Sequence, residues 1–454
     1  MTFNHIRKPW LYLLEGRQKS PFAPVRNNLI RVTGMPGAYV GSKETDVLYI
    51  TQPIGFVVKD DEHALRLKDE LAEWLVTSEA VPLQFDDEPG RTYYAEIEGT
   101  IEDFSRFVDQ RRGVITFLVA DGHSYGAERT ATISDTATIE NKGTAEADPI
   151  FELTAKKKAT FAMISNGIEE YNLIGTPADD DVQVVDTRTS VLYENGSTID
   201  TWSPAPLDMV ETQFIDSLDG VMGTDGAGIR PSNYGTVRQN QRGAGVFKEL
   251  PTAIQDFEIE STFDIISRRE IENWRMGIML YDENMNNIGM IGLKDNSRNH
   301  RRRTPLARYG EYRGGGLRNG YLIGDADKYD NARETTLFYL RMKREGNTFN
   351  FYIGEWLNFR HVRHWEATYR DVDNRWNGRL KYIVLYITSY QDRPIPSRIR
   401  MNTVELFELT RATVDQTPYI IYPGDVVTFD HKDEDILING EPRMDLKNFG
   451  GSFF

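Results

Sequence analysis

The sequence VPLQFDDEPGRTYYAEIEG, residues 81–99, is the centre of a longer stretch, 72–125, that decides the fold of the N-terminal part of the chain. A strand signal at Leu83–Phe85 precedes the turn Asp86–Arg91, and a second strand signal begins at Tyr93. The apolar run Val114–Leu118 adds a further strand. Nothing in this stretch has the arrangement of a catalytic site. The pattern predicts a frame that assembles with copies of itself and displays the later part of the chain.

A helix is predicted directly before this sheet, over 60–76. Its apolar residues recur at helical spacing on one face, and they are Ala64, Leu67, Leu71, Trp74 and Leu75. Asp60 or Asp61 can cap the first turn, and Pro82 prevents continuation. One helix packed on a small antiparallel sheet predicts an α+β unit. The glycine-rich segment 35–46 is predicted to form an exposed hairpin tip, where subunits often exchange an edge strand.

The composition limits the classes of function. The chain has 454 residues and a formal net charge of −16, so nonspecific binding to nucleic acid is disfavoured. The absence of cysteine excludes disulfides, thiolate metal sites and cysteine nucleophiles. No apolar run approaches the roughly 20 residues of a membrane span, and no secretion signal is recognised. The protein is expected to be made in a bacterial cytoplasm, as an enzyme or as a virion part released by lysis.

Residues 209–409 contain longer and more aromatic strand patterns than the rest of the chain. The predicted strands are Phe257–Ile265, Arg275–Tyr281, Ile288–Leu293, Leu337–Lys343, Phe349–Ile353, Tyr382–Tyr390 and Ile399–Leu409. Long antiparallel strands of this kind predict a jelly-roll sandwich of roughly 200 residues. A basic, glycine-rich patch over 297–320, with seven arginines that include Arg318, lies between them.

The motifs of the N-terminal stretch occur in the order shown by one known family. They are Trp74 at the end of the helix, Phe85-Asp86-Asp87 at the turn, and Gly90-Arg91-Thr92-Tyr93-Tyr94-Ala95 after it. Phe117 and Asp121-Gly122-His123-Ser124-Tyr125 come next, and Val32–Gly37 is similar to the start of such proteins. Residues 1–125 thereby resemble the N-terminal domain of the distal tail protein of siphophages, the long-tailed phages, of Gram-positive bacteria.

Two separated segments resemble the halves of this family's galectin-like domain. The first is 141–175, which begins Asn141-Lys142-Gly143-Thr144. The second contains Tyr422-Pro423-Gly424-Asp425, Asn439-Gly440 and Gly451-Ser452-Phe453-Phe454. The family pattern usually continues with one further strand. The whole arrangement resembles the evolved distal tail proteins, in which a carbohydrate-binding module is inserted into the galectin-like domain.

The expected fold class is therefore mainly β, in four segments. An N-terminal α+β ring-forming domain is expected over 1–130. A galectin-like β-sandwich is split between 131–204 and 413–454, and an inserted jelly-roll, a concanavalin- or lectin-like β-sandwich, occupies 205–412. The galectin-like halves lack the His-x-Asn-x-Arg and Trp-x-x-Glu-x-Arg signatures of sugar-binding galectins, so this domain is predicted to be purely structural.

The resemblance implies a structural hub in the baseplate of a virion rather than an enzyme. It implies a homohexameric ring that joins the tail tube protein to the tail-associated hub protein at the tail tip. The inserted module would bind host cell-wall polysaccharide, and six weak sites on one rigid frame would act at high effective concentration. Neither nucleic acid nor a membrane is expected as a partner.

Saccharide sites stack sugar rings on aromatic side chains and hold the hydroxyls with polar ones. Residues 355–376 concentrate both kinds. The candidates are Trp356, Trp365, Tyr369, Trp376, Arg363, Asp371 and Asp373, together with Tyr309 and Tyr312 from the basic patch. Core packing is an alternative explanation for each Trp. The patch itself can bind phosphates of a wall polymer or an acidic surface of the same assembly.

Two other hypotheses stay open. A carbohydrate-active enzyme would need paired carboxylates, and Glu258 and Glu260 share a strand face, although exposed strand positions explain them equally well. The other hypothesis is a hub whose insertion serves only as a spacer or as a docking surface. No cofactor is expected, because the acidic loops 216–225 and 325–330 offer oxygen ligands for calcium but fit no defined motif.

Overall fold

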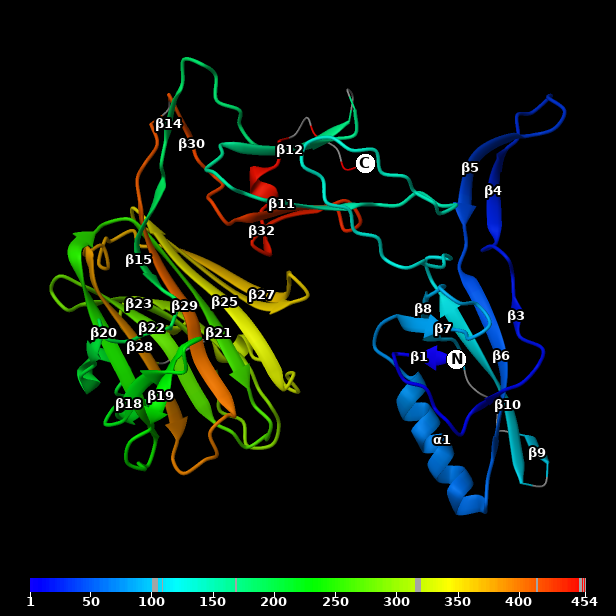
Figure 1. The fold of residues 1–454 in the computed structure, drawn as a ribbon, viewed down its shortest axis with the longest axis horizontal. Coiled ribbons are helices and arrows are strands. Elements are labelled where there is room, and N and C mark those ends of the chain that lie inside the picture. The colour runs from blue at the N-terminus through cyan, green and yellow to red at the C-terminus, as the bar shows by residue number, and fades with distance from the viewer. Residues whose placement is uncertain are drawn as a thin grey trace. The chain divides into compact units, whose positions relative to one another are not determined.

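The computed structural model describes residues 1–99, 105–107, 109–167, 170–314, 320–413, 415–448, 451 and 453. Arg318, Ser452 and Phe454, which the sequence singled out, lie outside these ranges. The chain forms two compact units, 1–146 and 147–454 (Figure 1). Most of the described residues in regular structure are in strands, so the predicted, mainly β fold class is confirmed. No helix in the described ranges combines the length and apolarity of a membrane crossing.

The first unit is one helix packed on a sheet. The sheet order is β1 (Thr2–Phe3), β7 (Val81–Gln84), β8 (Tyr93–Ile97), β10 (Gln110–Val119), β6 (Leu48–Val57) and β2 (Tyr12–Leu13), with β3 (Gln18–Lys19) on β6 and β9 (Ser105–Phe107) on β10. The helix α1 (Asp61–Leu75) is capped by Asp60, which accepts a hydrogen bond from the backbone of His63. All five apolar residues predicted for its inner face are buried, which confirms the expected α+β unit.

The acidic turn after β7 is held by cations from the start of the chain. Asp86 accepts hydrogen bonds from the N-terminal ammonium and from Arg7, and Glu88 binds Lys19 at 2.6 Å. Asp87 is paired with Arg17. Local sequence thus fixes the turn, while charges about 70 to 85 positions away hold it against β1 and β3.

A hairpin made of β4 (Val25–Ile30) and β5 (Tyr39–Thr45) extends from this unit as an arm (Figure 1). The two strands pair only with each other among the described residues, and every residue in them is exposed. The predicted hairpin is therefore present. It starts earlier in the chain than predicted. The turn lies over 31–38, and most of the segment 35–46 that was predicted as the tip forms the strand β5.

The second unit contains a smaller β region built from chain on both sides of the larger sandwich. Its main sheet has the order β11 (Ile150–Thr154), β31 (Val426–Asp430), β32 (Asp435–Ile438) and β33 (Glu441–Pro442). Two hairpin strands, β12 (Phe161–Ser165) and β13 (Tyr171–Gly175), lie beside it, and β14 (Gln183–Val185) pairs with β30 (Gln416–Pro418). Because β11 pairs with β31, the two separated segments meet in one sheet.

The larger sandwich has two sheets, whose neighbouring strands are antiparallel except for one short parallel pair at the side of the second sheet. The β21 sheet has the order β18 (Val221–Thr224), β19 (Ile229–Asn233), β29 (Arg398–Leu409), β21 (Phe257–Ile266), β25 (Thr335–Glu345), β26 (Thr348–Leu357) and β27 (Arg360–Arg370), with β15 (Arg188–Glu194) on β29. The β22 sheet has the order β16 (Ser203–Pro204), β20 (Gln241–Ile254), β28 (Leu380–Tyr390), β22 (Trp274–Asp282), β23 (Asn287–Asp295) and β24 (Thr304–Tyr309), with β17 (Ile215–Ser217) on β20.

Every strand predicted over 257–409 is present. The sequence did not predict β20, β24 or β27, which carry glycines, a proline or many charges. The apolar core lies between the sheets and receives alternate residues such as Trp274, Met276 and Ile278. The intervening residues point to the other face of the β22 sheet, where residues 205–218 and 321 cover them.

Candidate functional site

The edge of the sandwich where β24 and β27 approach each other contains Tyr309 and Tyr369. Their rings stack with centroids 3.5 Å apart and planes inclined by 8°. Both side chains are half-buried, and both pack against the core. A hydrogen bond with Tyr309 is the main cause that raises the pKa of Tyr369 to about 12. The stack covers one face of each ring, so that face is not available to a sugar.

Trp376 covers the adjacent turn. Its backbone N–H donates to the buried carboxylate of Asp371 at 2.8 Å. Its indole lies so close over Gly310 that a Cβ there would come within 2.3 Å of the ring. The guanidinium carbon of Arg313 lies 5.7 Å from the ring centroid. Asp371 and Trp376 therefore form a structural corner, which leaves the indole half-buried.

Trp365 belongs to a separate stack on the same edge strand. Its ring lies 5.8 Å from that of Tyr329, and the guanidinium of Arg363 lies 3.8 Å above the Tyr329 ring. The hydroxyl of Tyr329 donates to Glu355 at 2.5 Å. Arg363 is exposed and Trp365 is half-buried, so a strip of this stack is accessible to solvent.

The three other sequence candidates lie elsewhere. Trp356 packs edge-on to His361, which approaches Gly440 of the smaller β region. Tyr312 packs against Phe214 and Tyr321 over the β22 sheet. Asp373 is exposed beside Arg375. The structure thus brings Tyr309 to Tyr369 and Asp371 to Trp376, but the nine candidates are spread over several environments.

The basic patch is not a continuous surface. Arg303 is completely buried and paired with Asp295, and Arg308 is buried with Glu211. Glu211 also pairs with Arg275 and accepts a hydrogen bond from Tyr321. Burial alone would raise the pKa of Glu211, but the two guanidinium groups outweigh it and lower that pKa. These groups form an internal charge network, so Arg303 and Arg308 of the patch are not available to bind wall phosphates.

The carboxylates considered for catalysis are also engaged. Glu258 and Glu260 both pair with Arg188, and Glu258 lies 3.7 Å from Arg341, which binds Glu441 of the smaller β region at 2.6 Å. Burial raises the pKa of Glu260. Glu258 and Glu260 thus belong to a network of ion pairs that links the larger sandwich to the smaller β region.

The carboxylates of the acidic loops form ion pairs with arginine side chains. Asp219 pairs with Arg238, Asp225 with Arg400, and Asp330 with Arg302. Among the described residues, no group of three or more His, Asp or Glu side chains has the arrangement of a metal site. The loops are thus explained by hydrogen bonds and ion pairs.

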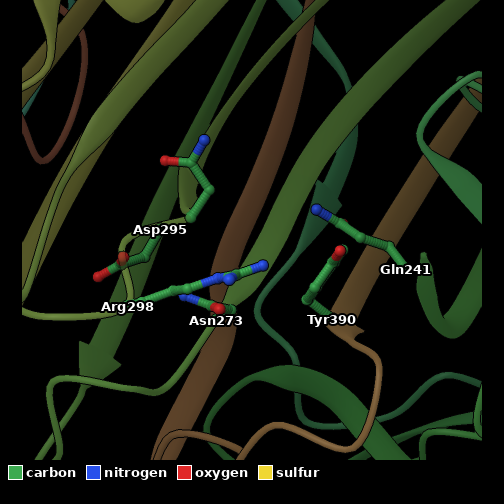
Figure 2. Close-up of a pocket in the computed structure, with 6 residues that line it drawn as sticks. Gln241, Asn273, Asp295, Arg298 and Tyr390 are labelled. Atoms are coloured by element: carbon green, nitrogen blue, oxygen red, sulfur yellow. The ribbon is translucent and has the colours of Figure 1, made fainter. Parts of the chain in front are cut away.

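A polar cavity of about 240 Å³ opens at one end of the β22 sheet, and Arg298 is the one residue of its lining that belongs to the predicted basic patch. It is lined by Gln241, Asn273, Asp295, Asn296, Arg298 and Tyr390 (Figure 2). These residues lie at the ends of β20, β28, β22 and β23 or directly beyond them. They are up to 149 positions apart in the chain, so no local motif marks them. Burial raises the pKa of Asp295 to about 7.

Residues 7–119 match the family model described as a phage tail protein RIFT-related domain. The N-terminal unit therefore contains a phage tail domain, which confirms the resemblance drawn from Trp74, the turn at Phe85 and the motif at Gly90. No curated protein sequence matches this chain at a significant level.

Several solved structures are similar at low identity. The CBM2 module of the evolved Dit of Lactobacillus casei BL23 phage J-1 is 11% identical, covers 50% of this chain and 100% of its own, and has a TM-score of 0.39. The SPP1 Dit protein, described as a paradigm of hub adsorption apparatus in phages infecting Gram-positive bacteria, is 8% identical over 89% of this chain and 96% of its own, with a TM-score of 0.25. SCLam, a non-specific endo-β-1,3(4)-glucanase of family GH16, is 9% identical over 52% of this chain and 96% of its own, with a TM-score of 0.35. These TM-scores are too low to bear on function.

Proposed function

We propose that this chain is a structural hub of the tail tip of a siphophage that infects Gram-positive bacteria. In this proposal the N-terminal units form a homohexameric ring between the tail tube protein and the tail-associated hub protein. The single observation that carries it is the match of residues 7–119 to a phage tail domain. The chain would be made in the host cytoplasm and carried in the virion.

The arm of β4 and β5 supports assembly. A two-stranded hairpin alone is marginally stable in water, and this one exposes large apolar side chains along its length. They are Val25, Leu29, Ile30, Val32, Met35, Tyr39 and Val40, each between 42% and 63% exposed. A neighbouring copy that covers the arm would bury this surface and pair its strand edges.

The arm can be tested by placing one charge in it. Leu29→Glu is expected to dissociate the ring into smaller species, because the carboxylate would be buried without a partner at the contact. Leu65→Glu is the matched control, since Leu65 is exposed to 61% on α1, away from the arm strands. Sedimentation velocity measures both variants. Intact hexamers of Leu29→Glu would contradict the role of the arm.

We further propose that the larger sandwich binds a saccharide of the host cell wall. Two parts of it offer suitable chemistry: the accessible strip of aromatic rings that includes Trp365, and the polar cavity beside Gln241. Binding of the full-length protein to purified cell walls of several Gram-positive species tests this. Saturable binding to walls of some species is expected. A well-folded hexamer that binds no wall would identify the sandwich as a spacer or docking surface instead.

The alternative of a carbohydrate-active enzyme is disfavoured by the pairing of Glu258 and Glu260 with Arg188. A catalytic pair needs both carboxyl groups in contact with the substrate, whereas Glu258 is buried and both groups face Arg188. Release of reducing ends from wall glycans, lost in Glu258→Gln while the protein stays folded, would favour the enzyme over the hub.

A further inference from the structure

The polar cavity is built from residues at the ends of four adjacent strands. Gln241 begins β20 and is paired with Tyr390, which ends β28. Asn273 directly precedes β22, and Asp295 ends β23 opposite Trp274. Figure 2 shows Gln241 and Tyr390 on one side of the cavity, with Asp295 and Arg298 on the other. The sheet therefore holds this wall rigidly.

Two buried amides in the wall keep hydrogen-bonding atoms unused. Asn273 is 3% exposed and donates its amide to the carbonyl of Ser297, which fixes its Oδ1 as a free acceptor. Gln241 is 8% exposed, and its Oε1 accepts from Thr388. No described residue accepts a hydrogen bond from Gln241 Nε2. Neither this atom nor Asn273 Oδ1 is fully enclosed by protein. Both side chains are buried, but these two atoms are reached by solvent and have no partner among the described residues, so both are available to a ligand.

The rim adds further groups without internal partners. Arg298 and Asn296 are exposed, and neither makes a hydrogen bond or an ion pair with another described residue. The Tyr390 hydroxyl accepts from Gln391 Nε2 at 3.2 Å, so its own proton is free to be donated. The cavity thus offers donors from Gln241, Tyr390 and Arg298, and an acceptor from Asn273.

A mixture of donors and acceptors selects a ligand rich in hydroxyl groups, because each hydroxyl both donates and accepts. An anion needs donors alone, and here it would face Asn273 Oδ1 and the Asp295 carboxyl group. The volume of about 240 Å³ is below the 300–1,000 Å³ typical of pockets for drug-sized ligands. One sugar ring matches this space, whereas an oligosaccharide would have to extend past Arg298 into solvent.

We infer that this cavity is the saccharide-binding site of the sandwich, and that it holds one neutral sugar ring through Gln241, Asn273, Tyr390 and Arg298. The inference rests on the proposed function, because it locates the saccharide binding proposed there. It also moves the site away from the aromatic edge, where Tyr309 and Tyr369 stack on each other and Trp376 packs over Gly310.

The test uses the full-length protein with purified Gram-positive cell walls and with free glucose, galactose, rhamnose and N-acetylglucosamine. Saturation-transfer NMR detects the free sugars, and pelleting measures wall binding. Arg298→Ala and Gln241→Glu are each expected to weaken binding at least tenfold, since each removes a donor to the ligand. Arg268→Ala is the matched control, because Arg268 is an exposed arginine of the same sandwich that pairs only with Glu334 among the described residues. Trp365→Ala tests the aromatic edge.

The outcomes separate the cavity site from the proposed function. Loss of binding in Arg298→Ala and Gln241→Glu, with Arg268→Ala and Trp365→Ala unaffected, supports the cavity. Binding that survives both cavity variants and is lost in Trp365→Ala overturns the cavity site but leaves the proposed function standing. Absence of wall and sugar binding in the unmodified, folded protein overturns both the cavity site and the proposed saccharide binding, but not the proposed hub. Competition of inorganic phosphate with the sugar at the cavity would overturn the assignment to a neutral ligand.

Discussion

The aromatic edge and the polar cavity belong to the same sandwich, but they use their side chains in opposite ways. At the edge, Tyr309 stacks on Tyr369 and Trp376 covers Gly310, so most of the aromatic surface is already in contact with protein. At the cavity, Asn273 and Gln241 are nearly as buried as core residues, yet each keeps one polar atom free. A concentration of aromatic residues is therefore weaker evidence for a binding site than a few solvent-reached polar atoms, on otherwise buried side chains, that have no protein partner.

This comparison separates residues that stabilise the fold from residues that are available to a ligand. Substitution of the first kind is expected to reduce the free energy of unfolding, and substitution of the second kind to reduce only binding. The loss of stability should be greatest where a buried charge loses its partner and least where an exposed cavity residue is shortened.

Glu211→Ala should have the largest effect on stability. It would leave Arg275 and Arg308 buried without their carboxylate, and breaking a buried ion pair in this way costs about 3–5 kcal/mol. Denaturation by urea, followed by tryptophan fluorescence, measures the loss. Glu270→Ala is the control, because Glu270 is exposed in a loop and should change stability by less than about 0.5 kcal/mol. Equal stabilities of the two variants would show that the network is not structural.

Gly310→Ala should break the corner under Trp376. Gly310 has a φ of +58°, and an added Cβ would lie 2.3 Å from the indole ring. Backbone strain and overlap together are expected to cost about 3 kcal/mol. Gly314→Ala is a close control, since its φ is +63° but its nearest neighbour would be 3.7 Å away. If Gly310→Ala and Gly314→Ala reduce the free energy of unfolding equally, the contact between Trp376 and Gly310 contributes little. The indole of Trp376 would then be available to a ligand.

His361 should give the sandwich a dependence on pH. Burial lowers its pKa to about 4, and its Nε2 is enclosed with no hydrogen-bond partner among the described residues. Its Nδ1 lies 2.7 Å from the hydroxyl of Tyr352, and Tyr339 and His364 are also close. The pKa of histidine in the unfolded chain is about 6.5, so between these values the unfolded chain binds more protons. Stability is therefore lost as the pH falls, by about 2 kcal/mol between pH 7 and pH 5.

The variant His361→Gln should lose this part of the pH dependence, whereas His364→Gln, which changes an exposed neighbour, should keep it. Urea midpoints at the two pH values measure the difference between each variant and the unmodified protein. If the urea midpoint of His361→Gln falls between pH 7 and pH 5 as much as that of the unmodified protein, His361 becomes protonated in the folded protein without a loss of stability.

Arg298→Ala should have the smallest effect on stability. Its side chain is exposed and makes no hydrogen bond or ion pair with a described residue, so the free energy of unfolding should change by less than about 0.5 kcal/mol. Thermal unfolding measures this. A large loss would show that Arg298 is a structural residue, and the contrast between the edge and the cavity would disappear.

Local patterns predicted much of the fold. The spacing of Ala64, Leu67 and Leu71 was sufficient for α1, because helix periodicity and an Asp60 cap are local signals. The apolar strands of the sandwich were found for the same reason. By contrast, β20 contains Gly243, Gly245 and Pro251, and β27 is an edge strand with many charges, so neither shows a buried pattern.

The candidate site depended on contacts that a local pattern does not carry. The arginines of 297–320 read as an exposed patch, but Arg303 and Arg308 are neutralised by Asp295 and Glu211, the latter 97 positions away from Arg308. The cavity is formed where four strands end, and only the register of the β22 sheet brings Gln241 to Tyr390. The division of residues 147–454 at 204/205 and 412/413 stays a prediction, because they form one compact unit.

The mass of the assembled full-length protein at micromolar concentration, measured by native mass spectrometry, tests the central claim most directly. The proposed hub predicts a closed assembly with six times the 52.1 kDa mass of one chain. A single species with the mass of one chain would contradict the ring, and with it the proposal that this protein is the hub of a phage tail tip.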